Sequence, residues 1–202
     1  MPVLLRAATA KGAATREAII DRAHAIARAE GLEGLSIGSL AAAVGMSKSG
    51  VFTHFGSRED LQLAVLDLAA EEFTREVIAP AFQAPRGIAR LRALHSRWVD
   101  WLRRDDGACL MIGAAGEYDD RPGALRERAI FHLHRLRTTL ARSIAMCIES
   151  GELRADIDAS QMAFEMFGIV LALNHDARLF GRADAAVRGR QAFEHLLATY
   201  HA

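Results

Sequence analysis

Several kinds of residue are scarce in this 202-residue chain, and each scarcity argues against a class of protein. Cys109 and Cys147 are the only cysteines, without a C-x-x-C spacing or a histidine at ligand spacing, which argues against a disulfide framework or a zinc site. We expect buried thiols in a reducing compartment; a redox switch is the alternative. With four prolines and 51% hydrophobic residues, the chain is expected to fold rather than stay disordered.

Long apolar segments and alternating segments are missing as well. No stretch reaches about 18 apolar residues, and the N-terminal MPVLLRAATAKG has too short an apolar run for a signal peptide. No run resembles a set of alternating strands, so an all-α fold is favoured. We therefore expect a cytoplasmic protein without a membrane partner.

Net charge is also absent, because 25 Lys and Arg residues balance 25 Asp and Glu residues. The distribution is uneven. Residues 1–58 hold seven basic and four acidic side chains, a net charge of +3, which leaves −3 for the remainder. A basic head on an acidic body would orient the head toward phosphate, so the overall balance does not exclude nucleic acid.

The most informative segment is residues 36–61, SIGSLAAAVGMSKSGVFTHFGSREDL. Ser36 predicts the N-cap of a short helix that Gly45 stops, and Ser47 predicts the N-cap of a second helix that ends at Gly56. Two short helices joined by a three-residue turn containing glycine are the helix-turn-helix pattern. In that geometry the second helix enters the DNA major groove and the first crosses the backbone.

The second helix divides into an inward and an outward side. Val51 and Phe55 lie one turn apart and are expected to face the core. Lys48 can donate to guanine O6 or N7, and a solvated surface lysine is the alternative. The predicted groove-facing set is Lys48, Ser49, Gly50, Phe52 and Thr53.

The run G-M-S-K-S-G-V-F-T-H-F-G-S-R-E-D-L, preceded by an amphipathic helix and the turn A-E-G-L-E-G-L-S-I, resembles the N-terminal DNA-binding domain of TetR-family repressors. The specific pattern covers residues 15–66, and the remainder fits as a helical arrangement. The resemblance implies an all-α homodimer that binds a palindromic operator in double-stranded DNA and releases it when a small-molecule effector enters the C-terminal domain. We therefore expect a transcriptional repressor and not an enzyme.

The resemblance also assigns contacts and shows two departures. Ser36, His54 and Arg58 match positions that usually touch phosphate. Phe52 stands where relatives commonly have tyrosine, so a phosphate hydrogen bond is absent, and Gly38 stands where some relatives place a base-reading arginine. The sequence therefore relies on Lys48 and on DNA shape for specificity. The full predicted DNA-binding set is Ser36, Ser47, Lys48, Ser49, Gly50, Phe52, Thr53, His54 and Arg58.

We expect three regions along the chain. Residues 1–14 form a flexible N-terminal arm, residues 15–60 the three-helix helix-turn-helix domain, and residues 61–202 a helical effector-binding and dimerisation domain. A helix over residues 58–78, ended by Pro80, begins beside the DNA and enters the body, so it is the natural lever between the two.

The C-terminal body offers aromatic and thioether side chains with few charges, which favours a largely apolar effector. The alternative is that these residues fill the core. Asp119 and Asp120 are interpreted as a solvated loop, and His132 and His134 lie on different helix faces, so neither a metal nor another cofactor is expected. The candidate effector-binding residues are Trp98, Trp101, Met111, Phe131, Met162 and Phe164.

A partner subunit is expected because residues 162–173 are apolar nearly all round, and a chain of this size has little protein to surround them. The last two helices of each chain would form a four-helix interface through Phe167, Leu171, Phe193 and Leu197.

Two other functions stay open. The first is that of a DNA-binding dimer without an effector. The second is that of a small all-α enzyme in which a histidine and a carboxylate act as acid and base, although the sequence shows no recognisable nucleophile and base. Its candidate residues are His95, His132, His175, Glu117 and Asp119.

Overall fold

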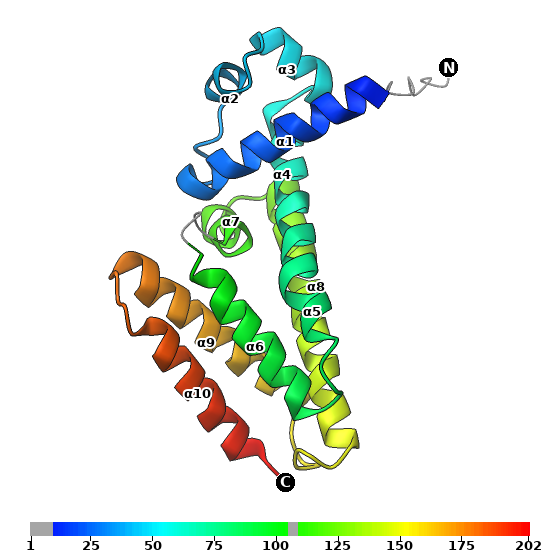
Figure 1. The fold of residues 1–202 in the computed structure, drawn as a ribbon, viewed down its shortest axis with the longest axis vertical. Helices are drawn as coiled ribbons and strands as arrows, with labels where there is room; N and C mark the ends of the chain where they lie inside the picture. The colour runs from blue at the N-terminus through cyan, green and yellow to red at the C-terminus, as the bar shows by residue number, and fades with distance from the viewer. Residues whose placement is uncertain (1–9, 105–108) are drawn as a thin grey trace.

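A computed structural model describes residues 10–104 and 109–202, and all of the longer elements within them are helices. An upper lobe comprises α1 (Ala10–Glu30), α2 (Ile37–Ala43) and α3 (Lys48–Phe55), packed on the first turns of α4 (Arg58–Phe73). Figure 1 shows α4 running from this lobe down one side of the body, where it lies beside α8 (Ala124–Glu149). The predicted all-α fold is confirmed.

The helix boundaries of the upper lobe follow the predicted caps. The Ser36 hydroxyl accepts the Ser39 N–H at 3.0 Å, and the Ser47 hydroxyl accepts the Gly50 N–H at 3.1 Å. Gly56 ends α3 with a φ of 76°, a left-handed conformation that glycine adopts without strain. Local cap chemistry therefore fixes these boundaries.

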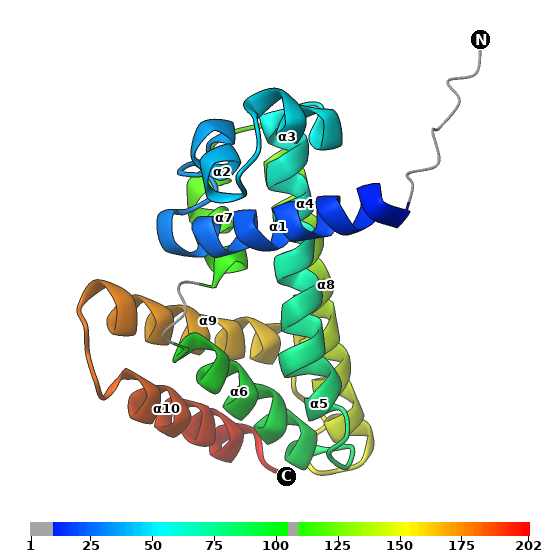
Figure 2. The same ribbon diagram turned by 45° about the horizontal axis from the view of Figure 1, so that its top comes forward.

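The body contains the remaining long helices. It consists of α6 (Ile88–Leu102), α7 (Leu110–Tyr118), α8, α9 (Ala159–Leu179) and α10 (Ala185–Tyr200). In Figure 2, α6, α9 and α10 lie together below the upper lobe, and Figure 1 shows α7 as the helix of the body directly below α1. One continuous set of buried apolar residues runs through both parts. No described helix has the length and apolar character needed to span a membrane.

The helix predicted over residues 58–78 is not one uninterrupted α-helix. The chain remains helical as far as Ala81, but a π-helical turn, η1 (Thr74–Ile78), separates α4 from α5 (Ala79–Ala81). Pro80 has no N–H for the carbonyl four residues back, and its ring would clash with that carbonyl in a regular α-helix. The wider turn, in which the Ala79 N–H donates to the Thr74 carbonyl, relieves this conflict.

The N-terminal boundary also differs from the expectation. Residues 1–9 of the predicted arm lie outside the described part of the chain. Residues 10–14 are helical and belong to α1 rather than to an arm. The glycine at position 12 does not interrupt the helix, because a single glycine in a helix costs only about 1 kcal/mol relative to alanine.

Candidate functional site

The outward side of α3 forms the candidate DNA-binding surface. Val51 is completely buried and Phe55 is 7% exposed, so these two side chains anchor the helix as predicted. The opposite side is exposed, and Phe52 is 45% exposed although it is a large apolar residue. The exposed residues of this side are Lys48, Ser49, Phe52 and Thr53. They lie on the side of α3 that the sequence predicts to face the DNA groove.

Lys48 lies against α2 over Gly38. A Cβ atom added at Gly38 would lie 3.3 Å from Lys48 Cε and 3.6 Å from Lys48 Nζ. The missing side chain at position 38 thus leaves room for the lysine stem, and an arginine there would place a second cation beside the ammonium group. The glycine at position 38 and the placement of the Lys48 side chain are therefore structurally linked.

The hydroxyl groups of α3 are already partly engaged in the protein. Thr53 Oγ1 donates to the Ser49 carbonyl at 2.9 Å, which leaves its lone pairs to accept from a base and its methyl group to contact thymine. The Ser47 and Ser49 hydroxyls are 3.0 Å apart. Ser36 and Ser47 serve as helix caps, and His54 is half-buried at the end of α3.

Arg58 has a structural connection that the sequence pattern does not show. Its Nε donates to the Leu35 carbonyl at 2.8 Å, and its Nη2 donates to the Glu33 carbonyl at 2.5 Å. These bonds tie the start of α4 to the turn before α2. The guanidinium is half-exposed, so any phosphate contact would be made by a group that already holds the domain together.

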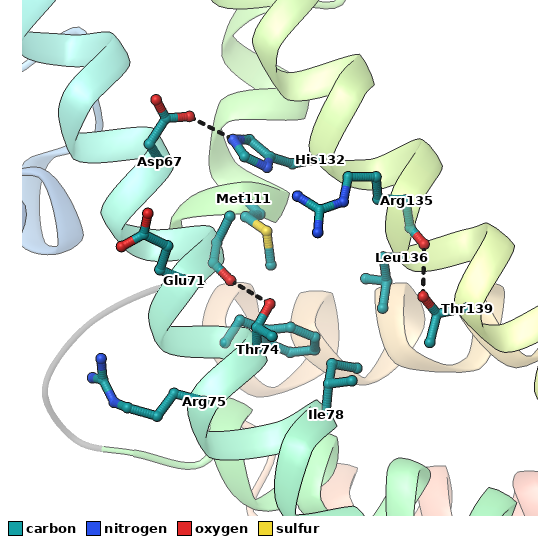
Figure 3. Close-up of a pocket in the computed structure, with 12 residues that line it drawn as sticks. Asp67, Glu71, Thr74, Arg75, Ile78, Met111, His132, Arg135, Leu136 and Thr139 are labelled. Carbon is teal, nitrogen blue, oxygen red and sulfur yellow. Dashed lines mark hydrogen bonds and ion pairs between the residues drawn. The ribbon is translucent and has the colours of Figure 1, made fainter. Parts of the chain in front are cut away.

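An open cavity of about 440 Å³ lies between α4, η1, α7 and α8 (Figure 3). Its apolar wall includes Phe73, Ile78, Met111 and Leu136. This volume lies within the range of about 300–1,000 Å³ that is typical of small-molecule sites. The π-helical turn supplies Thr74, Arg75 and Ile78 to the lining, and such turns are frequent at functional sites.

Most charges at the cavity are paired within the protein. Asp67 accepts a hydrogen bond from His132 Nε2 at 2.7 Å if that nitrogen is protonated, and it also pairs with Arg128. Figure 3 shows the Arg135 guanidinium directed into the space between α4 and α8. Among the described residues, Arg135 has no carboxylate partner and instead lies over the Phe131 ring, 5.5 Å from its centroid. The cavity therefore combines an apolar wall with the Arg135 guanidinium and the Glu71 carboxylate.

Thr74 and Thr139 complete the polar part of the lining. Each hydroxyl donates to the carbonyl four residues earlier in its own helix, at 2.8 Å for Thr74 and 2.9 Å for Thr139. Their lone pairs remain available to accept hydrogen bonds from a ligand. Both hydroxyls are labelled at the cavity in Figure 3.

The six predicted effector-binding residues do not line one cavity. Met111 belongs to the cavity wall, whereas Trp98, Trp101 and Met162 are buried in the core. Phe131 is 53% exposed and Phe164 is 57% exposed, both outside this cavity. Trp98 and Trp101 pack edge-on against Phe73, which is itself a cavity residue. The aromatic stripe of α6 therefore supports the cavity wall from behind.

The predicted dimerisation residues are also divided between interior and surface. Phe193 and Leu197 are each 2% exposed and pack inside the chain, and the Phe193 ring stacks on His95 with a centroid distance of 4.1 Å. Phe167 is half-buried, and Leu171 is exposed on α9. Large apolar side chains at the surface of α9 and its end are Phe164, Leu171, Leu179 and Phe180.

The cysteines are unpaired thiols, and both are buried. Burial raises the pKa of Cys109, and burial together with the nearby Glu152 carboxylate raises the pKa of Cys147 to about 11. Both shifts disfavour the reactive thiolate. Among the described residues, no cluster of three His, Cys, Asp or Glu side chains is arranged to hold a metal ion.

The residues proposed for the enzymatic alternative have other partners. His132 contacts Asp67, His95 is buried against Phe193, and the Glu117 carboxylate accepts two backbone N–H groups. Within the described ranges, no hydrogen bond or ion pair joins His95, His132 or His175 to Glu117 or Asp119. This arrangement lacks the contacts of an acid–base pair.

Helices α1 to α4 define a helix-turn-helix DNA-binding protein. Residues 19–65 match the family described as bacterial regulatory proteins, tetR family, and residues 87–193 match the tetracyclin repressor-like C-terminal domain. The chain belongs to this family and is a DNA-binding transcriptional regulator, as the sequence motif predicts.

Solved structures agree with this assignment. A TetR transcriptional regulator from Chloroflexus aurantiacus is 29% identical, with a TM-score of 0.83 over 94% of this chain and 96% of that one. A TetR-family regulator from Cytophaga hutchinsonii is 22% identical, with a TM-score of 0.84 over 96% and 98%. The regulator AibR, solved with isovaleryl coenzyme A and operator DNA, is 21% identical, with a TM-score of 0.71 over 92% and 97%. No curated protein sequence matches the chain.

Proposed function

We propose that this regulator is a homodimeric repressor that binds a palindromic operator through α3 and is released from it by a largely apolar small molecule. The observation that carries the effector part is the cavity between α4, η1, α7 and α8 (Figure 3). Its wall includes α4, which begins directly after the recognition helix. A ligand that separates α4 from α8 would therefore act on the element that carries the DNA-binding domain.

The lining supports an amphipathic ligand with a small polar end. Phe73, Ile78, Met111 and Leu136 provide the apolar surface. Arg135 can donate to an acceptor group on the ligand. Asp67 is already paired with Arg128 and His132, and Arg75 lies near Glu72 and Glu76, so Arg135 is left to compensate one negative charge on a ligand. The Glu71 carboxylate in the same lining would oppose a second negative charge.

The surface of α9 supports dimerisation. Phe164 and Leu171 are exposed large apolar residues on one helix, and Leu179 is 67% exposed at its end. Large apolar side chains exposed along one helix are typical of a protein–protein contact. A second copy of the chain would cover it and bring two copies of α3 to the two half-sites of a palindrome.

The experiment uses a palindromic duplex that the wild-type protein selects from a random pool. Fluorescence anisotropy measures its binding at fixed salt, and a library of apolar compounds is screened for release. Ala70→Phe adds a ring at the cavity wall and is expected to keep DNA binding while it abolishes release. Ala155→Phe, in an exposed turn outside the cavity, is the matched control and should respond as the wild type does.

Thermodynamic linkage provides a second readout. The factor by which a compound weakens operator binding must equal the factor by which operator weakens binding of the compound. Release that is equally strong in Ala70→Phe would reject this cavity as the effector site. Failure of the wild type to select any palindrome would reject the repressor mechanism itself.

A further inference from the structure

The turn that leads into the DNA-binding helices is held by a carboxylate from the C-terminal body. After α1 ends, Gly31 has a φ of 82°, and the next two backbone N–H groups donate to Glu117. The Leu32 N–H donates to Oε1 at 3.1 Å, and the Glu33 N–H donates to Oε2 at 2.8 Å. Both oxygens of one side chain on α7 are thus used by this turn.

The surroundings make this contact specific. Leu32 is completely buried. Without the Glu117 carboxylate its N–H would have no acceptor within hydrogen-bond distance among the described residues, and an unpaired donor at a buried residue destabilises the fold. A Cβ atom added at Gly31 would lie 2.7 Å from Glu117 Oε1. Gly31 is therefore favoured twice: its positive φ suits glycine, and a side chain at this position would push the Glu117 carboxylate away from the turn.

Two neighbours of Glu117 reinforce the contact through Glu33. The Tyr118 hydroxyl donates to Glu33 Oε1 at 2.8 Å, and Arg121 Nη1 lies 3.5 Å from the same oxygen. The hydrogen bond from Tyr118, together with Arg58 and Arg121, lowers the pKa of Glu33 despite an opposing effect of burial. Glu33 is therefore ionised near neutral pH, which keeps these contacts charge-assisted.

Side chains of α4 also donate hydrogen bonds to the turn. Gln62 Nε2 donates to the Leu32 carbonyl at 2.6 Å, and Arg58 donates to the Glu33 and Leu35 carbonyls. These residues follow α3 directly along the chain. Within the described residues, hydrogen bonds and ion pairs from beyond α4 reach residues 31–35 from Glu117, Tyr118 and Arg121.

We propose that Glu117 is a positioning residue for operator binding: its carboxylate fixes the α1–α2 turn to α7 and thereby sets the orientation of the recognition helix relative to the C-terminal body. The turn ends at Ser36, the N-cap of α2, so fixing it fixes α2 and α3. This inference rests on the proposed function, because the body sets the distance between the two recognition helices of a dimer.

The test replaces Glu117 by glutamine, which turns one acceptor oxygen into an NH₂ donor that faces a backbone N–H. Glu127→Gln, at an exposed position of α8, is the matched control. Three duplexes are compared: the palindrome selected by the wild type, a single half-site, and the palindrome with one base pair added between its half-sites. All are measured by anisotropy at the same salt concentration.

The expected result is selective. Glu117→Gln binds the palindrome about tenfold more weakly, because the correctly oriented state becomes a minor fraction of the population. Its half-site affinity equals that of the wild type, and its discrimination against the lengthened palindrome falls. Glu127→Gln behaves as the wild type on all three duplexes. Tyr118→Phe, which removes only the hydroxyl group, shows the same pattern with a smaller loss.

Two outcomes would overturn the positioning role. Unchanged palindrome binding by Glu117→Gln is one. The other is an equal loss on the half-site and the palindrome, which would indicate general damage to the DNA-binding domain.

Amide hydrogen exchange at Leu32 and Glu33 tests, in the absence of DNA, whether the Glu117 carboxylate holds these two N–H groups. Faster exchange in Glu117→Gln would support the proposal, and unchanged exchange would overturn it. A wild-type protein without a preference for any palindrome would instead contradict the proposed function.

Discussion

His95 is expected to make the stability of the body sensitive to mild acid. Its side chain is on α6, is 2% exposed as a residue, and stacks on Phe193 of α10 with an interplanar angle of 8°. Burial lowers the pKa of His95 from 6.5 to about 4, and the nearby Arg190 adds to the shift while Glu194 opposes it. The imidazole is therefore neutral in the folded protein at neutral pH.

The sign and size of the effect follow from proton linkage. The unfolded chain binds a proton at His95 as the pH falls through 6.5, whereas the folded protein does so only near pH 4. Stability from this group is thus complete above pH 6.5 and is lost as the pH falls toward 4. The difference corresponds to about 3 kcal/mol over the whole window and about 2 kcal/mol between pH 8 and pH 5.

The assay is urea unfolding of the wild type and His95→Phe at a series of pH values, with the protein concentration held constant because a dimer unfolds in a concentration-dependent way. Phenylalanine keeps an aromatic ring against Phe193 and removes the titrating group. The variant should lose about 2 kcal/mol less than the wild type between pH 8 and pH 5.

The matched control for this assay is His134→Gln, at an exposed position on α8. It should follow the wild-type curve, because its imidazole is exposed in both states. An identical pH dependence for His95→Phe and the wild type would show that His95 does not cause the loss of stability in acid.

Four further predictions concern DNA binding and assembly. We propose that the Lys48 ammonium contacts a base, so Lys48→Ala should weaken operator binding by about 1–3 kcal/mol and relax specificity; equal losses on operator and random DNA in a competition assay would contradict this. Phe52→Tyr should tighten binding in gel-shift titrations at fixed salt, because the exposed ring can carry a hydroxyl to phosphate; unchanged or weaker binding would mean that the ring has another role. Arg58→Ala should lower the free energy of unfolding by about 1–2 kcal/mol, since two hydrogen bonds to the α1–α2 turn are lost at a half-exposed site, and unaltered urea unfolding would count against that role. Leu171→Glu should shift sedimentation at micromolar concentration toward the monomer, whereas an intact dimer would place the interface elsewhere.

The helix-turn-helix lobe was predictable from the sequence because its determinants are local. Ser36 and Ser47 cap helices through N–H groups three residues away, and Gly56 ends α3 through its own φ angle. The inward side of α3 followed from the one-turn spacing of Val51 and Phe55, both of which are buried. Each of these signals is contained within about one helical turn of chain.

The cavity was not predictable in the same way, because it depends on how separate helices are paired. Asp67 and His132 are 65 residues apart, and neither belongs to a recognisable motif. The spacing of the aromatic residues on α6 predicted that they lie inside the C-terminal body, but it did not show whether they line a ligand cavity or fill the core. Trp98 and Trp101 are both buried, whereas Arg135, which faces the cavity, looks in sequence like one of many surface arginines.

For Arg58 and Gly31 the local sequence pattern predicted one role each but did not predict their contacts with residues distant in the sequence. Gly31 was predictable as a helix stop, and it does end α1, but the group that crowds it is the carboxylate of Glu117, 86 positions further along the chain. Arg58 matched a phosphate-contacting position, yet its guanidinium binds the carbonyls of the same turn. Both residues meet at residues 31–35, where α1, α4 and α7 are joined. Because this junction directly precedes α2, a change in how α7 packs on it would alter the position of α3 without any change in the residues that face DNA.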